Sequence, residues 1–155
     1  SIHSGIRFNI IPEELEMVGT IRTLDKEMKE HIRSRIKYMV PNIAKAYRAN
    51  ATVEIKDGAD ITFNDPHLTK KMIPSLQKIV GINNVIEIPA ITAAEDFSYF
   101  QSKIPGFYFF LGGTPLEISE SEAPSHHTPD FFVDDKSLII GVKALSQLAI
   151  DYLSN

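Results

Sequence analysis

The sequence contains no cysteine and no tryptophan among its 155 residues. The lack of cysteine excludes a disulfide scaffold, thiolate chemistry and thiolate metal ligands from this chain. No apolar run approaches the roughly 20 residues that a membrane-spanning helix needs. A Gly-x-Ser-x-Gly motif is also missing, which argues against a hydrolase with a serine nucleophile on an α/β-hydrolase elbow. We therefore expect no membrane partner and no serine or cysteine nucleophile.

An excess of basic residues is missing as well. The chain has 16 lysine and arginine residues against 20 aspartate and glutamate residues, which gives a formal net charge of -4. Because a nucleic-acid surface needs a basic patch, we expect no nucleic-acid partner. Hydrophobic residues make up 43% of the sequence, which is ordinary for a globular chain that buries a core.

Hydrophobic periodicity predicts a small α+β layer in residues 1–57. Residues 2–11 and 15–21 alternate like strands around a turn and predict a β-hairpin. A helix is expected over residues 25–49, with Asp25 as its N-cap and a one-sided apolar stripe. Pro41 should kink this helix or split it in two. Residues 51–56 alternate again and predict a third strand, and residues 57–60 have the composition of a domain boundary.

Residues 58–155 predict an α/β layer in which strands alternate with helices. Helices are expected over residues 66–80, residues 95–102 and the segment from Asp134 or Asp135 to Leu153. Strands are expected over residues 83–88 and 107–111, and the second reads as buried on both faces because it is continuously apolar. The last helix should turn one apolar stripe inward, made of Leu138, Val142, Leu145, Leu148 and Tyr152.

The loop at residues 123–132 is the first candidate for chemistry. It places His126 and His127 near Asp130, between two prolines that stiffen the backbone. Imidazole is a common ligand of catalytic zinc, copper, nickel and manganese. A loop histidine is more often structural, and the dipeptide alone favours that interpretation. A complete metal site in this chain would need acidic partners.

Glu95 and Asp96 are the second candidate, at the start of a predicted short helix. They can satisfy the free N–H groups of the helix start, which is the more common role in isolation. In the functional interpretation they lie at the mouth of the α/β sheet, where loops after strands collect ligands. The sequence leaves both roles open.

Asn9 and Arg22 are the third candidate, with Asn9 on the first predicted strand and Arg22 at the end of the second. Across a hairpin the two side chains can project from one face and grip a substrate carboxylate or carbonyl oxygen. The alternative is an ordinary surface contact between strands.

Five segments, taken in their order and spacing, carry a resemblance to a known family. They are Ser-Gly-Ile-Arg-Phe-Asn-Ile-Ile-Pro at 4–12, Gly-Thr-Ile-Arg-Thr-Leu-Asp at 19–25, Ala-Glu-Asp-Phe-Ser-Tyr-Phe at 94–100, Pro-Gly-Phe-Tyr-Phe-Phe-Leu-Gly at 105–112 and His-His-Thr-Pro-Asp-Phe at 126–131. As a set they resemble the aminoacylase and amidohydrolase family of two-metal peptidases, which includes hippurate hydrolases, auxin-conjugate hydrolases and N-acetyl-diaminopimelate deacetylases. The resemblance covers the chain from end to end.

The resemblance implies a two-part architecture. Residues 1–57 would be most of a ferredoxin-like lid, or dimerisation, domain, and residues 58–155 the C-terminal half of an α/β metallopeptidase catalytic domain. We then expect this chain to be the C-terminal portion of a longer enzyme, inactive by itself, and the enzyme to be a homodimer through the lid domain.

The resemblance also assigns roles to individual residues. In the family the histidine directly before the x-Pro-Asp pattern is a metal ligand, which selects His127 over His126. The family's substrate-binding asparagine and arginine, often supplied by the neighbouring subunit, map to Asn9 and Arg22. Glu95 and Asp96 fall in the loop that lines the site. The family's other metal ligands and its general-base glutamate have no counterpart in this chain.

The activity implied by the resemblance is hydrolysis of the amide bond of N-acyl amino acids or dipeptide-like conjugates. Two divalent metals, zinc, manganese or nickel, would polarise the carbonyl and lower the pKa of a bridging water, and a glutamate outside this chain would take its proton. Asn9 or Arg22 would stabilise the oxyanion or hold the carboxylate. The alternative from another class is a non-catalytic dimerisation or binding module that pairs through the exposed edge of its first sheet.

Overall fold

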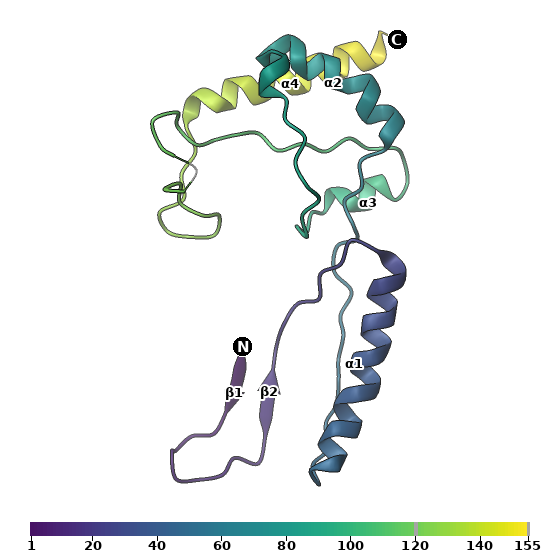
Figure 1. Ribbon diagram of the computed structural model, residues 1–155, viewed down its shortest axis with the longest axis vertical. Helices are drawn as coiled ribbons and strands as arrows, with labels where there is room; N and C mark the ends of the chain where they lie inside the picture. Colours follow the sequence, from purple (N-terminus) through teal and green to yellow (C-terminus); the bar gives the residue numbers. More distant parts are fainter. Residues whose placement is uncertain (120, 155) are drawn as a thin grey trace. The chain divides into compact units, whose positions relative to one another are not determined.

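The computed structural model describes residues 1–119 and 121–154, which form two compact units (Figure 1). The first unit comprises Ser1–Ile61 and Ala90–Ala94, and the second Thr62–Pro89 with the described part of Glu95–Asn155. The described chain is mostly helical, and its one sheet has two strands. None of its helices is long and apolar enough to span a bilayer. The identification of these units with a lid and a catalytic domain stays a prediction.

The sheet of the first unit is an antiparallel hairpin of β1 (Ile2–Ser4) and β2 (Leu15–Met17), in which His3 lies opposite Glu16. The predicted hairpin is therefore confirmed, but its strands are much shorter than residues 2–11 and 15–21. Gly5 follows β1 with a φ of 73°, a left-handed conformation that turns the chain out of the strand. Residues 6–10 then bend, with the Ile10 N–H donating to the Arg7 carbonyl at 3.4 Å.

Helix α1 (Lys26–Ala46) begins where the sequence predicts. The Asp25 carboxylate accepts a hydrogen bond from the Met28 N–H at 2.6 Å, so the predicted N-cap is confirmed. The helix continues through Pro41, and the predicted split is wrong. In that turn the Asn42 side-chain amide donates a hydrogen bond to the Tyr38 carbonyl at 2.7 Å. This bond adds a donor next to the place where Pro41 lacks a backbone N–H.

Residues 51–56 do not form the predicted third strand. Their side chains alternate between half-buried and exposed, as in a strand, but they belong to no hydrogen-bonded ladder. Alternation shows only that one face is covered, whereas a strand also needs a partner backbone.

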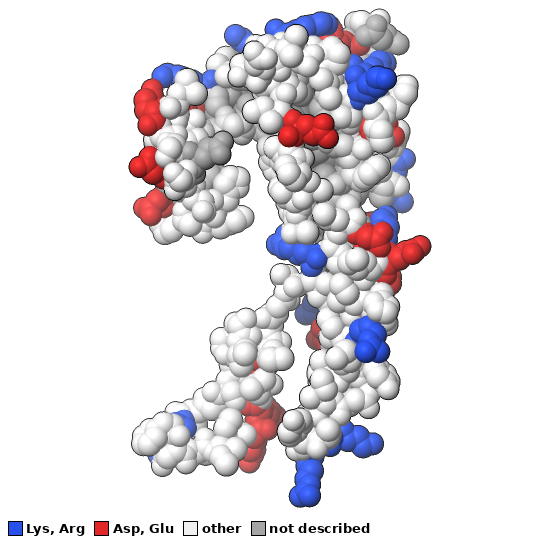
Figure 2. Space-filling model, viewed as in Figure 1, with Lys and Arg blue, Asp and Glu red and all other residues white. Residues whose placement is uncertain are grey.

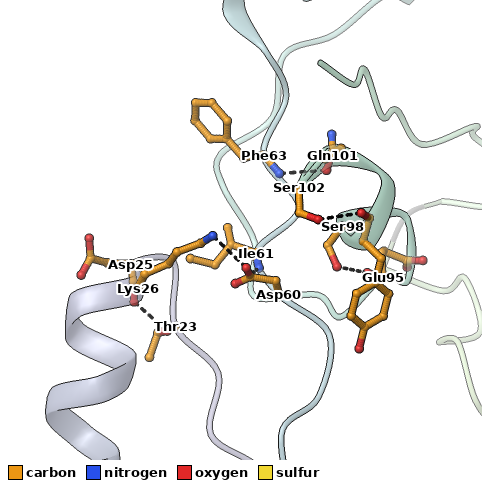
Figure 3. A network of polar contacts seen from close by, with 11 residues as sticks. Thr23, Asp25, Lys26, Asp60, Ile61, Phe63, Glu95, Ser98, Gln101 and Ser102 are labelled. Atoms are coloured by element: carbon orange, nitrogen blue, oxygen red, sulfur yellow. Dashed lines mark hydrogen bonds and ion pairs between the residues drawn. The ribbon is translucent and has the colours of Figure 1, made fainter. Parts of the chain in front are cut away.

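Two ion pairs fasten the chain after this segment to α1. Arg33 lies 2.6 Å from Asp57. Lys26 lies 2.8 Å from Asp60, as Figure 3 shows. The Lys26 ammonium, with the Ile61 N–H, lowers the pKa of the Asp60 carboxyl. Because the Lys26–Asp60 pair is largely exposed, we assign it a role in guiding the chain back along α1 rather than in overall stability.

The second unit is built on α2 (Pro66–Val80) and α4 (Asp135–Leu153), which pack against each other. Both helices lie where the sequence predicts them. Asp65 caps α2 by accepting from the Leu68 N–H at 2.7 Å, and Asp134 caps α4 by accepting from the Lys136 N–H at 3.0 Å. The fully buried apolar residues of the described chain all come from this pair: Met72, Leu76 and Ala144.

The predicted inward face of α4 is wrong for four of its five residues: Leu148 is half-buried, but Leu138, Val142, Leu145 and Tyr152 are 55–63% exposed. The buried residues of α4 are Ser137 and Ala144. Apolar residues occupy more than one side of this helix, so its stripe alone does not choose the contact face.

A polar contact joins α2 and α4 near their ends. The Lys78 ammonium lies 2.8 Å from one Asp151 carboxylate oxygen, and the Gln147 side chain donates to the other at 2.9 Å. The hydrogen bond from Lys78, followed by one from Ser75, lowers the pKa of the Asp151 carboxyl below its ordinary value. Asp151 therefore favours the folded state only while it is charged.

We expect this contact to make the second unit sensitive to acid. A lowered folded-state pKa means that the stabilisation is complete above the unfolded value of about 3.9 and disappears as the pH falls through the folded-state value. Urea denaturation at pH 5, 4 and 3 should show a smaller loss of stability for Asp151→Asn than for the unchanged chain. Glu117→Gln, at an exposed loop position, is the matched control and should keep the original slope. Equal slopes for the Asp151 variant and the unchanged chain would contradict this role.

The strands predicted at residues 83–88 and 107–111 are also wrong. Ile82–Asn84 form a short 3-10 turn, η1, and residues 107–111 are extended without a ladder. Here the Asn64 side chain replaces a neighbouring strand: its carbonyl oxygen accepts from the Tyr108 N–H at 2.6 Å, and its amide donates to the Tyr108 carbonyl at 2.7 Å. The predicted short helix exists as α3 (Phe97–Gln101), with fewer residues than expected.

Candidate functional site

The loop that carries His126 and His127 has an unusual backbone. His127 has a φ of 65°, in the left-handed region that residues with a Cβ rarely adopt. The Thr128 hydroxyl donates to the Ser125 carbonyl at 2.7 Å, and the Phe131 N–H donates to the Thr128 carbonyl at 3.2 Å, so the turn is closed around this residue. Backbone strain of this kind is concentrated at functional positions.

The two imidazoles of this loop differ in their surroundings. The His126 ring packs edge-on against Phe131, with ring centroids 4.6 Å apart. The His127 ring lies 6.4 Å from the His126 ring, is exposed, and hydrogen-bonds to no residue that the structure describes. The His126 ring is likewise exposed and without a hydrogen bond to any described residue, so the two histidines differ in the Phe131 contact and in the backbone of residue 127.

The described residues do not form a complete metal centre. Within residues 1–119 and 121–154, no three His, Asp or Glu side chains are placed to hold a metal ion. A catalytic zinc site needs at least three protein ligands. A neutral imidazole nevertheless has the donor chemistry of a zinc, nickel or copper ligand, and the assignment of His127 as a metal ligand stays a prediction.

Glu95 and Asp96 lie directly before α3. Asp96 occupies the N-cap position but its side chain makes no capping hydrogen bond, so the simple helix-capping interpretation does not hold for it. The Glu95 carbonyl accepts from the Ser98 hydroxyl at 2.7 Å (Figure 3). Burial, followed by the negative charge of Glu95, raises the pKa of the Tyr108 hydroxyl above its ordinary value.

Asn9 and Arg22 do not form the predicted cross-strand pair. Asn9 lies in the bend at residues 6–10, and Arg22 lies beyond the end of β2, so neither is in a strand. The Arg22 guanidinium donates to the Thr92 carbonyl at 3.0 Å, a contact that the alternation of the sequence does not reveal. Both side chains are exposed and make no hydrogen bond to each other.

Tyr108 and Asn64 were missed by the sequence reasoning. The available signal for Tyr108 is its hydroxyl, because it is the only polar side chain in the apolar run at residues 107–111. Asn64 gives no such signal, because the sequence Asn-Asp-Pro is typical of a loop that connects two elements. A shallow hollow of about 320 Å³ next to α3 involves neither residue and none of the predicted site residues; it is lined by Phe63, Asp65 and residues 101–106.

Known proteins resemble this chain along almost its whole length. Thermostable carboxypeptidase 2 of Saccharolobus solfataricus is 38% identical over 153 residues, which cover 98% of this chain and 38% of that protein. An N-acetyldiaminopimelate deacetylase of Streptococcus thermophilus is 31% identical over 147 residues, which cover 93% of this chain and 39% of that protein. The chain thus spans less than two fifths of the length of these relatives.

A solved structure shares the fold. The YXEP protein of Bacillus subtilis, described as a dinuclear metal binding peptidase from the M20 family, superposes with a TM-score of 0.72 at 24% identity and covers 100% of this chain and 41% of its own. The described chain thus has part of an M20 peptidase fold. The family model for peptidase family M20/M25/M40 matches residues 5–151. The resemblance carried by the five segments is confirmed, and the chain belongs to peptidase family M20/M25/M40.

Proposed function

We propose that the complete protein hydrolyses the amide bond of N-acyl amino acids or related dipeptide-like conjugates with two divalent metal ions. Relatives named as a carboxypeptidase and as N-acetyldiaminopimelate deacetylases support amide hydrolysis. The solved relative named as a dinuclear metal binding peptidase supports a pair of metals. This chain would supply part of the active site, and we do not expect it to be active by itself.

We further propose that residues 1–57 are most of a ferredoxin-like lid domain and residues 58–155 the C-terminal part of an α/β catalytic domain. The exposed surface supports this division of a larger fold. Large apolar side chains are exposed in both units, among them Phe8 in the first and Leu116 in the second. Exposed apolar surface of this kind is typical of a face that other polypeptide covers. Figure 2 shows broad uncharged areas between scattered charges on the face in view.

The observation that carries the proposed function is the strained, exposed His127 in a segment that matches the family. We assign it as the one metal ligand of this chain. Zinc, manganese or nickel, when bound, supplies Lewis-acid polarisation of an amide carbonyl and activates water. A glutamate outside this chain would serve as the general base for that water.

We assign Asn9, Arg22, Glu95 and Asp96 to substrate binding. Arg22 uses one N–H for the Thr92 carbonyl, which leaves other guanidinium donors for a substrate carboxylate or the developing oxyanion. Glu95 and Asp96 offer acceptors for the amide N–H of the substrate. A homodimer through the lid domain would bring the Asn9 and Arg22 of one subunit to the site of its partner, and both edges of the two-stranded sheet are available for pairing.

The test of this function is metal removal from the complete protein. We expect release of free amino acid from at least one member of a panel of N-acetyl-L-amino acids, loss of that activity on treatment with 1,10-phenanthroline, and its return with zinc, manganese or nickel. A non-chelating phenanthroline isomer is the control and should have no effect. A complete, metal-loaded protein that cleaves no N-acyl amino acid and no dipeptide would rule the proposal out.

A non-catalytic dimerisation or binding module is the second candidate function. The open edges of the hairpin and the exposed apolar face of α4 favour it, because both are suited to pairing with another chain. The same preparation separates the two functions. A stable dimer that neither retains metal nor cleaves any substrate would favour the module.

A further inference from the structure

The backbone of the histidine loop adopts a conformation that its residue types do not favour. Residues 126–127 form the turn between Ser125 and Thr128, and His127 has a φ of 65°. When the third residue of a four-residue turn has a positive φ, glycine or asparagine usually occupies that position, because most side chains with a Cβ are disfavoured there. A histidine at this position therefore needs support from the rest of the loop.

Thr128 supplies that support through its side chain. A four-residue turn is commonly closed by the N–H of its fourth residue, which donates to the carbonyl of the first. Here the Thr128 hydroxyl donates to the Ser125 carbonyl at 2.7 Å, so this hydrogen bond spans His126 and His127. Because the bond closes the turn, it favours the left-handed conformation of His127 over an extended one.

The position of the Thr128 hydroxyl is itself restricted. Pro129 follows, and a residue before a proline is biased toward extended conformations. The Thr128 carbonyl accepts from the Phe131 N–H at 3.2 Å, which closes a second turn over residues 129–130. Threonine is branched at Cβ, so its χ1 angle has few favourable values. The hydroxyl is therefore held close to the carbonyl that it contacts.

The two imidazoles of the loop are oriented in different ways. The His126 ring packs edge-on against Phe131, with ring centroids 4.6 Å apart, so a ring contact restricts its direction. The His127 ring is exposed and lies 6.4 Å from the His126 ring, so its direction depends mainly on the backbone at residue 127. A change of φ to a negative value would turn the His127 imidazole away from its present direction.

We propose that Thr128 is a positioning residue whose hydroxyl holds His127 in the left-handed conformation before metal binds. This inference rests on the proposed function, in which His127 is a metal ligand. A metal binds more tightly when its ligand already has the binding conformation, because the apparent affinity falls with the fraction of molecules in other conformations. In this role Thr128 acts through His127 and needs no contact with the metal.

The first test measures zinc affinity in the complete protein, by competition with a chromophoric chelator. Thr128→Val keeps the shape of the side chain and removes the hydroxyl, whereas Thr128→Ser keeps the hydroxyl. For the zinc that His127→Asn removes, we expect Thr128→Val to raise the Kd about tenfold and Thr128→Ser to leave it within about threefold. Thr114→Val, at an exposed threonine outside the loop, is the matched control and should leave the Kd unchanged.

The second test reads the conformation without metal. Crystal structures of the metal-free complete protein should show a positive φ at residue 127 in the unchanged chain and in Thr128→Ser, and a negative φ in Thr128→Val. The melting temperature of the metal-free protein should be the same for all three, because the hydrogen bond lies in an exposed loop. A negative φ in the unchanged metal-free protein would overturn the proposal, even if Thr128→Val failed to fold.

Failure of this inference can be told apart from failure of the proposed function. If Thr128→Val binds zinc as tightly as the unchanged protein, or if Thr128→Ser is impaired equally, while His127→Asn loses zinc, the positioning role is wrong and the hydrolase function stands. If His127→Asn retains both metal and activity, the proposed function is what fails, and the positioning role fails with it.

Discussion

Replacing His127 by asparagine in the complete protein should lower hydrolysis by about a hundredfold or more and remove bound metal, with a melting temperature equal to that of the metal-free unchanged protein, because only the stabilisation by bound metal is lost. Altering even the groups that support a metal ligand commonly costs 10- to about 100-fold, so loss of the ligand itself should cost at least as much. Asparagine adopts the left-handed conformation of residue 127 more readily than most residues, so the backbone is not strained further.

His126→Asn is the matched control for this experiment. It removes the neighbouring imidazole, which packs on Phe131, and should leave metal content and kcat near their original values. Metal content by mass spectrometry, steady-state kinetics and thermal melting provide the three readouts. If His127→Asn keeps normal activity and metal content, His127 is not a ligand.

Replacing Met72 by alanine should lower the free energy of unfolding of this chain by about 2–5 kcal/mol. Met72 is 4% exposed and is one of the few fully buried apolar residues in the described chain, so its truncation leaves a cavity between α2 and its neighbours. Urea denaturation followed by circular dichroism at 222 nm measures the change.

Leu145→Ala is the control that distinguishes the two sides of α4. Leu145 is 63% exposed, so in this chain its truncation should change stability by less than about 1 kcal/mol. In the complete protein, Leu145→Ala should lower the free energy of unfolding about as much as Met72→Ala does, because in our proposal the rest of the catalytic domain covers this face of α4. A large effect of Leu145→Ala in the chain described here would contradict the observed orientation of α4.

The helices could be predicted from the sequence because their signals are local. Asp25, Asp65 and Asp134 each cap a helix by accepting a backbone N–H within the next three residues, and Gly81 follows the last residue of α2 with a φ of 84°. Such capping signals depend on a few neighbouring residues, so they are independent of how the rest of the chain folds.

The strands and the contact faces could not be predicted in the same way. Whether residues 107–111 form a strand depends on a partner backbone, and the side chain of Asn64 takes that place. The buried residues of α4 are Ser137 and Ala144, whereas most of its larger apolar residues are exposed, so the apolar stripe alone does not identify the contact face. Periodicity describes one element at a time, whereas both outcomes are set by two elements together.

The candidate site was likewise predictable only where the signal is local. The family segments single out His127, Asn9, Arg22, Glu95 and Asp96, and these assignments stay predictions. The sequence placed Asn9 and Arg22 on paired strands, whereas the structure puts both outside them and ties Arg22 to Thr92. The hydrogen bonds between Asn64 and Tyr108 join two separate segments, so no local pattern could indicate them.

The pairing of α2 with α4 also affects the order of events during synthesis. The ribosome completes α2 well before α4, so Met72 and Leu76 have no partner helix until the chain has been made through residue 153. During that interval the nascent protein presents an uncovered apolar helix, the kind of surface that chaperones recognise. A premature stop within α4 should therefore yield an aggregating product rather than a shortened folded one.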